Sequence, residues 1–170
     1  FNSVLNSYGK INKSWVIFFK NFLSWKFDDF YKIFEECTSL TELGLSNNKF
    51  TGLDGNTFKQ LSQLTTWKLW SNQIDKLDAN LFETCSNLEE LDLGINKLTR
   101  IDGNTFKQLT KLTTLSLHKN QIESIDPKAF ETLSNLKWLL LHDNKIKHVH
   151  RKAFENLNSN SDYFHLQQSN

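Results

Sequence analysis

The sequence predicts an α/β repeat solenoid, in which each repeat supplies one short parallel β-strand and one short helical turn. A leucine recurs every 24 residues, an asparagine follows eight positions after each of these leucines, and a phenylalanine stands near the end of every unit. A fixed period of this length indicates units that bury their apolar faces by stacking on one another. The recurring leucines are Leu40, Leu64, Leu88, Leu112 and Leu136.

Residues 1–39 precede the first full repeat and fit two structures. Apolar residues in this segment fall at the spacing of one helix face, which predicts an amphipathic capping helix. All of them except Leu23 also fit a decayed repeat that has lost one residue. Either structure would cover the open end of the stack, where a bare strand edge invites pairing with other chains. The residues concerned are Val16, Phe19, Leu23, Phe27, Phe30 and Phe34.

Residues 40–159 hold five repeats without an insertion. Apolar residues alternate with outward-facing ones in each repeat, as Leu115 and Leu117 do in the segment 112–117, and this alternation predicts a strand. The strands would stack in parallel, about 4.8 Å apart. The chain leaves each strand at the asparagine, whose amide can both donate and accept hydrogen bonds. We therefore expect an asparagine ladder that satisfies the backbone of the turns.

An aspartate precedes the return segment in four of the five repeats, at Asp54, Asp78, Asp102 and Asp126. Aspartate is a favoured residue at a helix N-cap, and Pro127 stands at the first helical position, where proline is tolerated. The return side of each repeat is therefore predicted to hold a short helical turn. His150 replaces the aspartate in the fifth repeat, so we expect that turn to be capped less well.

Residues 160–170 are predicted to be a partial sixth repeat or a truncated C-terminal end. Phe164 and Leu166 resemble the start of a repeat that is shifted by one residue. The sequence begins at Phe1 rather than at a methionine, and no terminal cap follows the fifth repeat. We therefore expect the chain to be processed, excised or incomplete at its front, and the missing cap is consistent with a natural protein that is longer.

The two cysteines, Cys37 and Cys85, occupy the same repeat position, which is a leucine in other repeats. They lie two repeats apart, which corresponds to about 10 Å at the spacing of stacked strands. A disulfide needs Cα atoms within roughly 7 Å of each other, so we expect both thiols to be reduced. No histidine and asparagine arrangement around them predicts a catalytic thiol.

The repeated pattern LxxLxLxxNxIxxIxxxxFxxLxx resembles the "typical" 24-residue class of leucine-rich repeats, and the resemblance covers residues 34–159. This class occurs in Toll-like receptor ectodomains, variable lymphocyte receptors and secreted matrix repeat proteins. The resemblance implies a curved horseshoe with a concave parallel sheet that binds a protein or another ligand. It also implies an extracellular or cell-surface location. The cysteine-clustered caps of secreted members are absent, which favours the cytoplasm as the alternative.

The composition argues against several other functions. The net charge of +1 gives no long-range attraction to nucleic acid or to an anionic membrane. The longest apolar run, residues 15–19, is far shorter than the ~20 residues of a membrane span. A glycine-rich phosphate loop and a metal-spaced set of cysteines and histidines are both missing from the sequence. We therefore predict no cofactor, no metal and no catalytic residue.

The residues between the strand leucines are predicted to face the concave side, because successive side chains of a strand point to opposite faces. Most are polar, but Trp70, Trp138 and Leu140 are large and apolar. Tryptophan is enriched at binding hot spots, so these three residues mark the predicted partner-binding patch. Its polar members are Lys68, Asp92, His118 and His142. The two histidines are expected to be a solvated pair, since a metal would need a third ligand.

The predicted function is protein recognition, by a receptor-like or scaffold module with a concave binding face. The alternative is a structural repeat fragment whose parent protein binds its partner through repeats outside this sequence. An enzyme would need a pocket with converging titratable groups, which regular columns of repeated residues do not predict. The sequence predicts a protein partner and leaves the oligomeric state open.

Overall fold

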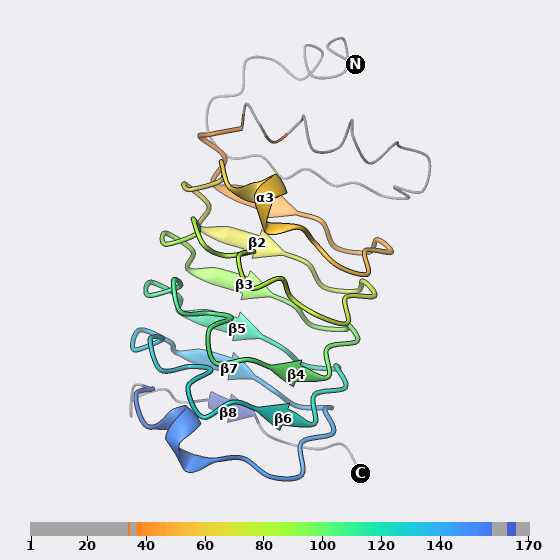
Figure 1. Ribbon diagram of the computed structural model, residues 1–170, viewed down its shortest axis with the longest axis vertical. Coiled ribbons are helices and arrows are strands. Elements are labelled where there is room, and N and C mark those ends of the chain that lie inside the picture. Colours follow the sequence, from red (N-terminus) through yellow and green to blue (C-terminus); the bar gives the residue numbers. More distant parts are fainter. Residues whose placement is uncertain (1–33, 35–36, 158–162, 166–170) are drawn as a thin grey trace.

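The computed structural model describes residues 34 and 37–157, together with the backbone of residues 163–165. The described chain winds through successive coils, and each coil adds one strand to a parallel sheet, in the order β1-β2-β3-β5-β7-β8 (Figure 1). These strands are β1 Glu42–Gly44, β2 Thr66–Lys68, β3 Glu90–Asp92, β5 Thr114–Ser116, β7 Trp138–Leu140 and β8 Tyr163–His165. The prediction of a leucine-rich-repeat solenoid with a parallel sheet is confirmed.

The strand register follows the sequence period. From β1 to β7 each residue pairs with the residue 24 positions later, so that Leu43 lies beside Trp67 and Leu91 beside Leu115. The last pair is offset by 25, because Trp138 pairs with Tyr163. The two alternatives for residues 1–39 fall almost entirely outside the described residues, of which Phe34 is one.

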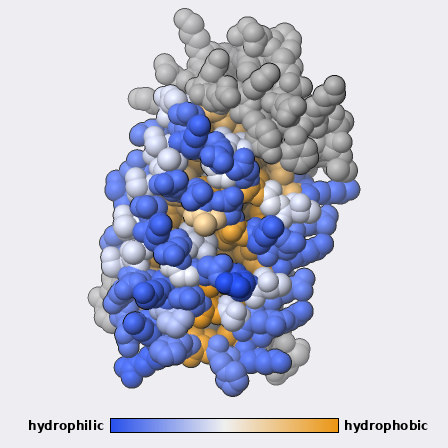
Figure 2. Space-filling model, viewed as in Figure 1, coloured by the Kyte–Doolittle hydropathy of each residue, from blue (hydrophilic) through white to orange (hydrophobic). Residues whose placement is uncertain are grey.

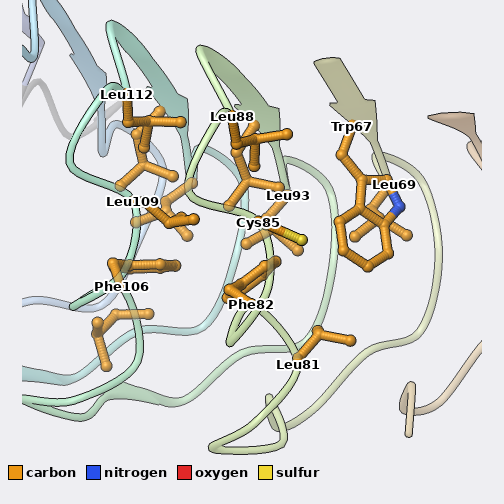
Figure 3. Close-up of a cluster of buried hydrophobic side chains, with 14 of the residues drawn as sticks. Trp67, Leu69, Leu81, Phe82, Cys85, Leu88, Leu93, Phe106, Leu109 and Leu112 are labelled. Atoms are coloured by element: carbon orange, nitrogen blue, oxygen red, sulfur yellow. The ribbon is translucent and has the colours of Figure 1, made fainter. Parts of the chain in front are cut away.

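One continuous apolar core runs along the stack. The recurring leucines are buried, and the phenylalanines of successive repeats approach one another with ring centroids 5.9 Å apart for Phe82 and Phe106 and 6.3 Å apart for Phe106 and Phe130 (Figure 3). Trp67 takes the place of a leucine, is fully buried and contacts the rings of Phe58 and Phe82 at 5.0 and 5.7 Å. Each repeat is therefore held by the layers above and below it.

The asparagine ladder is present. In the central repeat, Asn96 donates to the carbonyl oxygens of Leu93 and Leu69, both at 3.1 Å, and accepts from the backbone N–H of Ile74 at 3.0 Å. Asn72, Asn120 and Asn144 repeat this arrangement. Each asparagine thus satisfies backbone groups of its own turn and of the preceding repeat, which joins the turns into a stack.

A second ladder of side chains runs beside the asparagines. Lys97 donates to the Oε1 of Gln73 at 3.0 Å, and Lys145 donates to the Oε1 of Gln121 at 3.2 Å. Lysine and glutamine alternate along this column from repeat to repeat. Each of these bonds connects two neighbouring layers on the surface.

The return side is less helical than the sequence predicts. Within residues 37–157, helical geometry is limited to α3 (Gly55–Phe58) and η2 (Arg151–Phe154). Repeats two to four form turns instead, and two short strands, β4 (Arg100–Ile101) and β6 (Ser124–Ile125), pair in parallel there (Figure 1). The prediction of a helical turn is therefore confirmed in repeats one and five and wrong in repeats two to four. A return segment with room for about one turn gains few backbone hydrogen bonds, so its helical geometry is marginal.

The predicted caps are confirmed in three repeats. Asp54, Asp78 and Asp126 each accept a hydrogen bond from the backbone N–H two residues later, at 3.0, 2.8 and 2.8 Å. Asp102 is the exception, since its carboxylate is bonded to the guanidinium of Arg100. His150 retains the capping role and accepts from the N–H of Lys152 through Nδ1, at the longer distance of 3.2 Å.

Candidate functional site

The candidate site lies on the face of the main sheet that points away from the core. The register places equivalent positions of successive strands side by side, which forms rows that cross the sheet. One row consists of Lys68, Asp92, Ser116 and Leu140. Trp138 belongs to the neighbouring row, beside Thr114. Side chains two positions apart on a strand share a face, so both rows face the same way.

The structure divides the predicted patch into two groups. One group lies in the adjacent repeats four and five and consists of Trp138, Leu140, His118 and His142. Trp70 lies in repeat two, about 14 Å from the strand of Trp138 at a spacing of about 4.8 Å per layer. Lys68 lies in repeat two with Trp70, and Asp92 lies in repeat three, between the two groups. Trp138 is 42% exposed, and the side chains of Trp70 and Leu140 are half-buried.

His118 is the most firmly held member of the patch. Its Nδ1 lies 2.7 Å from the Oγ of Ser116, and its ring stacks on that of His142 with centroids 5.0 Å apart and an interplanar angle of 21°. The ring also covers Gly94 of the preceding repeat, because a Cβ placed on that glycine would lie 2.2 Å from the Cε1 of His118. A glycine at position 94 is therefore what allows the imidazole to lie across the sheet.

Burial in this position lowers the pKa of His118 below its usual value of 6.5. Nearby charges act in both directions, since Asp92 and Asp143 raise this pKa while His142 and Lys119 lower it. The imidazole of His118 is therefore neutral at pH 7. The buried Nδ1 of His142 has no hydrogen-bond partner within the described part of the chain.

Ser116, His118 and Asp92 are the residue types of a hydrolytic triad, but their geometry is structural. Asp92 directs its Oδ1 to the backbone N–H of Gly94 at 2.9 Å, and Ser116 is buried in the sheet. A nucleophilic serine needs access to a substrate and a base that is oriented by a third group. Here the serine orients the imidazole. Among the described residues, no group of three or more potential ligands could hold a metal ion.

The thiol of Cys85 is a poor nucleophile. Cys37 and Cys85 are not joined in a disulfide, and Cys85 lies in the core beside Phe82 (Figure 3). Burial raises the pKa of Cys85 to about 11, against a weaker opposing hydrogen bond with Thr84. A thiol with so high a pKa holds almost no thiolate at neutral pH, and the thiolate is the reactive form.

Three residues at the edges of this face were missed in the sequence. Ser116 and Gly94 position His118, and Ile95 is 39% exposed at a backbone φ of 53°. The same column holds Asn47, Ser71, Lys119 and Asp143, all at positive φ. A β-branched residue is disfavoured in this backbone region, so an isoleucine among small and polar residues was a visible signal.

The remaining surface is mostly polar. Figure 2 shows hydrophilic residues over most of the side that faces the viewer, with apolar residues visible in a band along the stack. No helix among the described residues is long and apolar enough to cross a membrane.

Comparisons with known proteins agree with this architecture. Residues 30–137 match the family described as "BspA type Leucine rich repeat region", in six copies. Two structures of the Toll–Spatzle complex from Drosophila, one of them glycosylated, contain a chain that is 27% identical with a TM-score of 0.70. The match covers 75% of this chain and 18% of the chain in the complex, so it spans less than a fifth of the length of that chain. A comparison with curated protein sequences gave no match.

Proposed function

Because this chain belongs to the BspA-type leucine-rich-repeat family, we propose that it is a protein-recognition module that binds a partner protein on the exposed face of its main sheet. The contact would be centred on Trp70, His118, Trp138, Leu140 and His142. Both matched structures are complexes of Toll with Spatzle, which supports a role in protein recognition.

The exposure of Trp138 is the observation that carries this proposal. A tryptophan that is 42% exposed on a strand leaves much of its apolar surface in water, and the same row holds glutamate and threonine in other repeats. Packing therefore does not require an aromatic residue there. A partner that covers the ring would remove this apolar surface from water, and the burial would stabilise the complex, as it does at hot-spot tryptophans.

The test combines cross-linking with affinity measurements. A photoreactive amino acid at position 138 should cross-link a partner from an extract of the source cells, whereas the same group at position 107 on the return side should not. With the partner purified, Trp70→Ala and Trp138→Ala should each weaken binding by about 30-fold, which corresponds to roughly 2 kcal/mol. Lys107→Ala is the matched control and should leave the affinity unchanged.

A second candidate is a structural repeat fragment whose parent protein binds through other repeats. The match to only 18% of the Toll–Spatzle chain favours it, because most of that chain has no counterpart here. The double variant Trp70→Ala, Trp138→Ala separates the two. Affinity that survives both changes would move the binding site to another face or to repeats outside this sequence.

A further inference from the structure

The return segment of the fifth repeat differs in charge from the other four. Segments 49–58, 73–82, 97–106 and 121–130 carry formal charges between −1 and +1. Segment 145–154 carries +4, with four cations and no acidic residue. We name this surface the basic edge, which consists of Lys145, Lys147, Arg151 and Lys152 together with His148 and His150. It lies around η2 (Figure 1).

The fold does not require these cations. The buried columns of the repeat are preserved by Ala153 and Leu157, while every member of the basic edge is exposed. The positions of Lys147 and Arg151 hold threonine, aspartate, glutamate, glycine, alanine or proline in the other repeats, whereas lysine recurs at the positions of Lys145 and Lys152. None of the four cations forms an ion pair within the described part of the chain, where Lys145 donates to the neutral Gln121. Clustered like charges repel, so the basic edge lowers stability rather than adding to it.

The cap of this turn is the second observation. Four repeats have an aspartate at this position, whereas in the fifth repeat the Nδ1 of His150 accepts the hydrogen bond from the Lys152 N–H. The capping bond is thus kept while the carboxylate that would offset the cations is gone. Aspartate would also be the better cap, because a negative charge is favourable at the start of a helical turn.

A hollow beside the cations is the third observation. It has a volume of about 390 Å³ and is lined by Lys145, Lys147, Glu123 and Asn144. Both polar atoms of the Asn144 amide are engaged in the asparagine ladder. The groups left for a ligand are therefore two ammonium groups and one carboxylate, which suits a molecule with both anionic groups and hydroxyl donors.

We propose that the basic edge binds a sulfated polysaccharide. Its sulfates would contact the lysines and Arg151, and its hydroxyls would donate to Glu123. Basic segments of this length are typical of polyanion-binding patches. A single-stranded nucleic acid would favour exposed Phe, Tyr or Trp rings for base stacking, and the basic edge contains none of these three residue types. A membrane surface would favour a broad apolar face, whereas the exposed large apolar residue here is Val149.

The experiment titrates the full chain with a size-defined heparin oligosaccharide by calorimetry, at two salt concentrations. We expect saturable binding that weakens as salt is raised, because ionic contacts are screened. The desulfated oligosaccharide, a single-stranded DNA and vesicles rich in phosphatidylserine serve as competing ligands. Binding of the DNA or the vesicles that is tighter than that of heparin would overturn the assignment to a polysaccharide.

Two variants test the residues. His150→Asp restores the residue of the other repeats, so it should keep or raise the melting temperature while it weakens heparin binding about threefold. Lys147→Glu with Arg151→Glu should weaken binding about tenfold or more. Lys59→Glu with Lys107→Glu changes the net charge equally on other repeats and should leave binding nearly unchanged.

Two results would contradict the proposal. One is His150→Asp binding heparin as tightly as the unmodified chain. The other is equal losses from the clustered and the dispersed charge reversals, which would indicate attraction to the net charge alone. The variant Trp70→Ala, Trp138→Ala should bind heparin as tightly as the unmodified chain. Heparin binding at the basic edge and partner binding on the sheet face are therefore tested separately.

Discussion

The sequence DGNTFKQL occurs twice in this chain, at residues 54–61 and 102–109, and folds differently in the two places. In the first copy Asp54 caps the N–H of Asn56 and the helix α3 follows. In the second copy Arg100 binds the carboxylate of Asp102, and a turn forms without helical geometry. The residue at the position of Arg100 in the first copy is Gly52, which cannot compete for the carboxylate.

The two copies give a matched test of the cap. Asp54→Ala should lower the free energy of unfolding by about 1 kcal/mol, because it removes an N-cap. Asp102→Ala should lower it by about 0.5 kcal/mol or less, because it removes an exposed ion pair. Urea denaturation of both variants checks the order. Equal losses would mean that Asp102 also acts as a cap in solution.

Gly94 controls the environment of His118. A methyl group at position 94 would meet the imidazole, so Gly94→Ala should push the ring toward solvent. Burial is the main cause of the lowered pKa of His118, and that pKa should therefore rise toward its ordinary value. An NMR titration of the ring protons measures it. Gly52→Ala is the control, because nothing lies within 4 Å of its added methyl group, and an unchanged pKa in Gly94→Ala would contradict the placement of the ring.

The lowered pKa of His118 also predicts how stability depends on pH. The unfolded chain has an ordinary histidine pKa, so as pH falls through about 6.5 it takes up a proton before the folded protein does. The free energy of unfolding should therefore decrease between about pH 7 and pH 5. His118→Gln should make this decrease shallower in denaturation curves recorded across that range. Parallel curves for the variant and the unmodified chain would count against a buried, neutral imidazole.

The sequence identified the position of His118 but not its surroundings. Strand alternation placed it on the sheet face, because periodicity depends only on the order of residues. Its contacts with Ser116 and Gly94 depend on side-chain rotamers and on the gap left by a neighbouring repeat, which no period encodes. The diversion of Asp102 to Arg100 was missed for the same reason.

At the scale of the single element, the asparagine turn is a unit that depends on its neighbour. Asn96→Ala would leave the buried N–H of Ile74 without its partner. The carbonyls of Leu69 and Leu93 would each lose one of two hydrogen bonds, because they also accept from Asn72 and Asn120. A buried group that is left without any bond costs about 1–3 kcal/mol, so we expect the free energy of unfolding to fall by about 1–3 kcal/mol. Chemical denaturation gives the value.

Asn48 supplies the control for this element. Its amide donates to Leu45 and Ser46 in its own turn, and its Oδ1 has no partner among the described residues. Asn48→Ala should therefore destabilise the protein by clearly less than Asn96→Ala. A loss as large as that of Asn96→Ala would show that the bonds within one turn, rather than those between layers, provide the stability.

The elements were predictable where a residue type alone decides the structure. Leucine and asparagine columns placed the strands and the ladder, since burial and amide hydrogen bonding repeat identically in each layer. The helical turns were overpredicted, because a segment of about one turn is only marginally helical and a capping bond does not decide the outcome. Asp78 and Asp126 make that bond in turns that are not helical. Trp67 shows the same limit, since a tryptophan in a leucine column is accommodated by rearranged rings that the pattern does not describe.

At the scale of the whole molecule, the aromatic rings connect the repeats into one cooperative core. Phe106 is fully buried between Phe82 and Phe130, so Phe106→Ala should lower the free energy of unfolding by about 3–5 kcal/mol. Phe154, in the fifth repeat, is only half-buried, and Phe154→Ala should cost less. Denaturation of both variants in guanidinium tests the order. The reverse order would place the least stable part of the stack in its centre.

The alternation of lysine and glutamine along one surface column has a consequence for how such an array can lengthen. Lys97 bonds to Gln73 and Lys145 to Gln121, so the chemical unit of this column is a pair of repeats, 48 residues long. A gene that duplicates 48 residues preserves every lysine beside a glutamine. A gene that duplicates 24 residues would set two lysines, or two glutamines, side by side. The array is therefore extended without new mismatches in even steps, whatever its length.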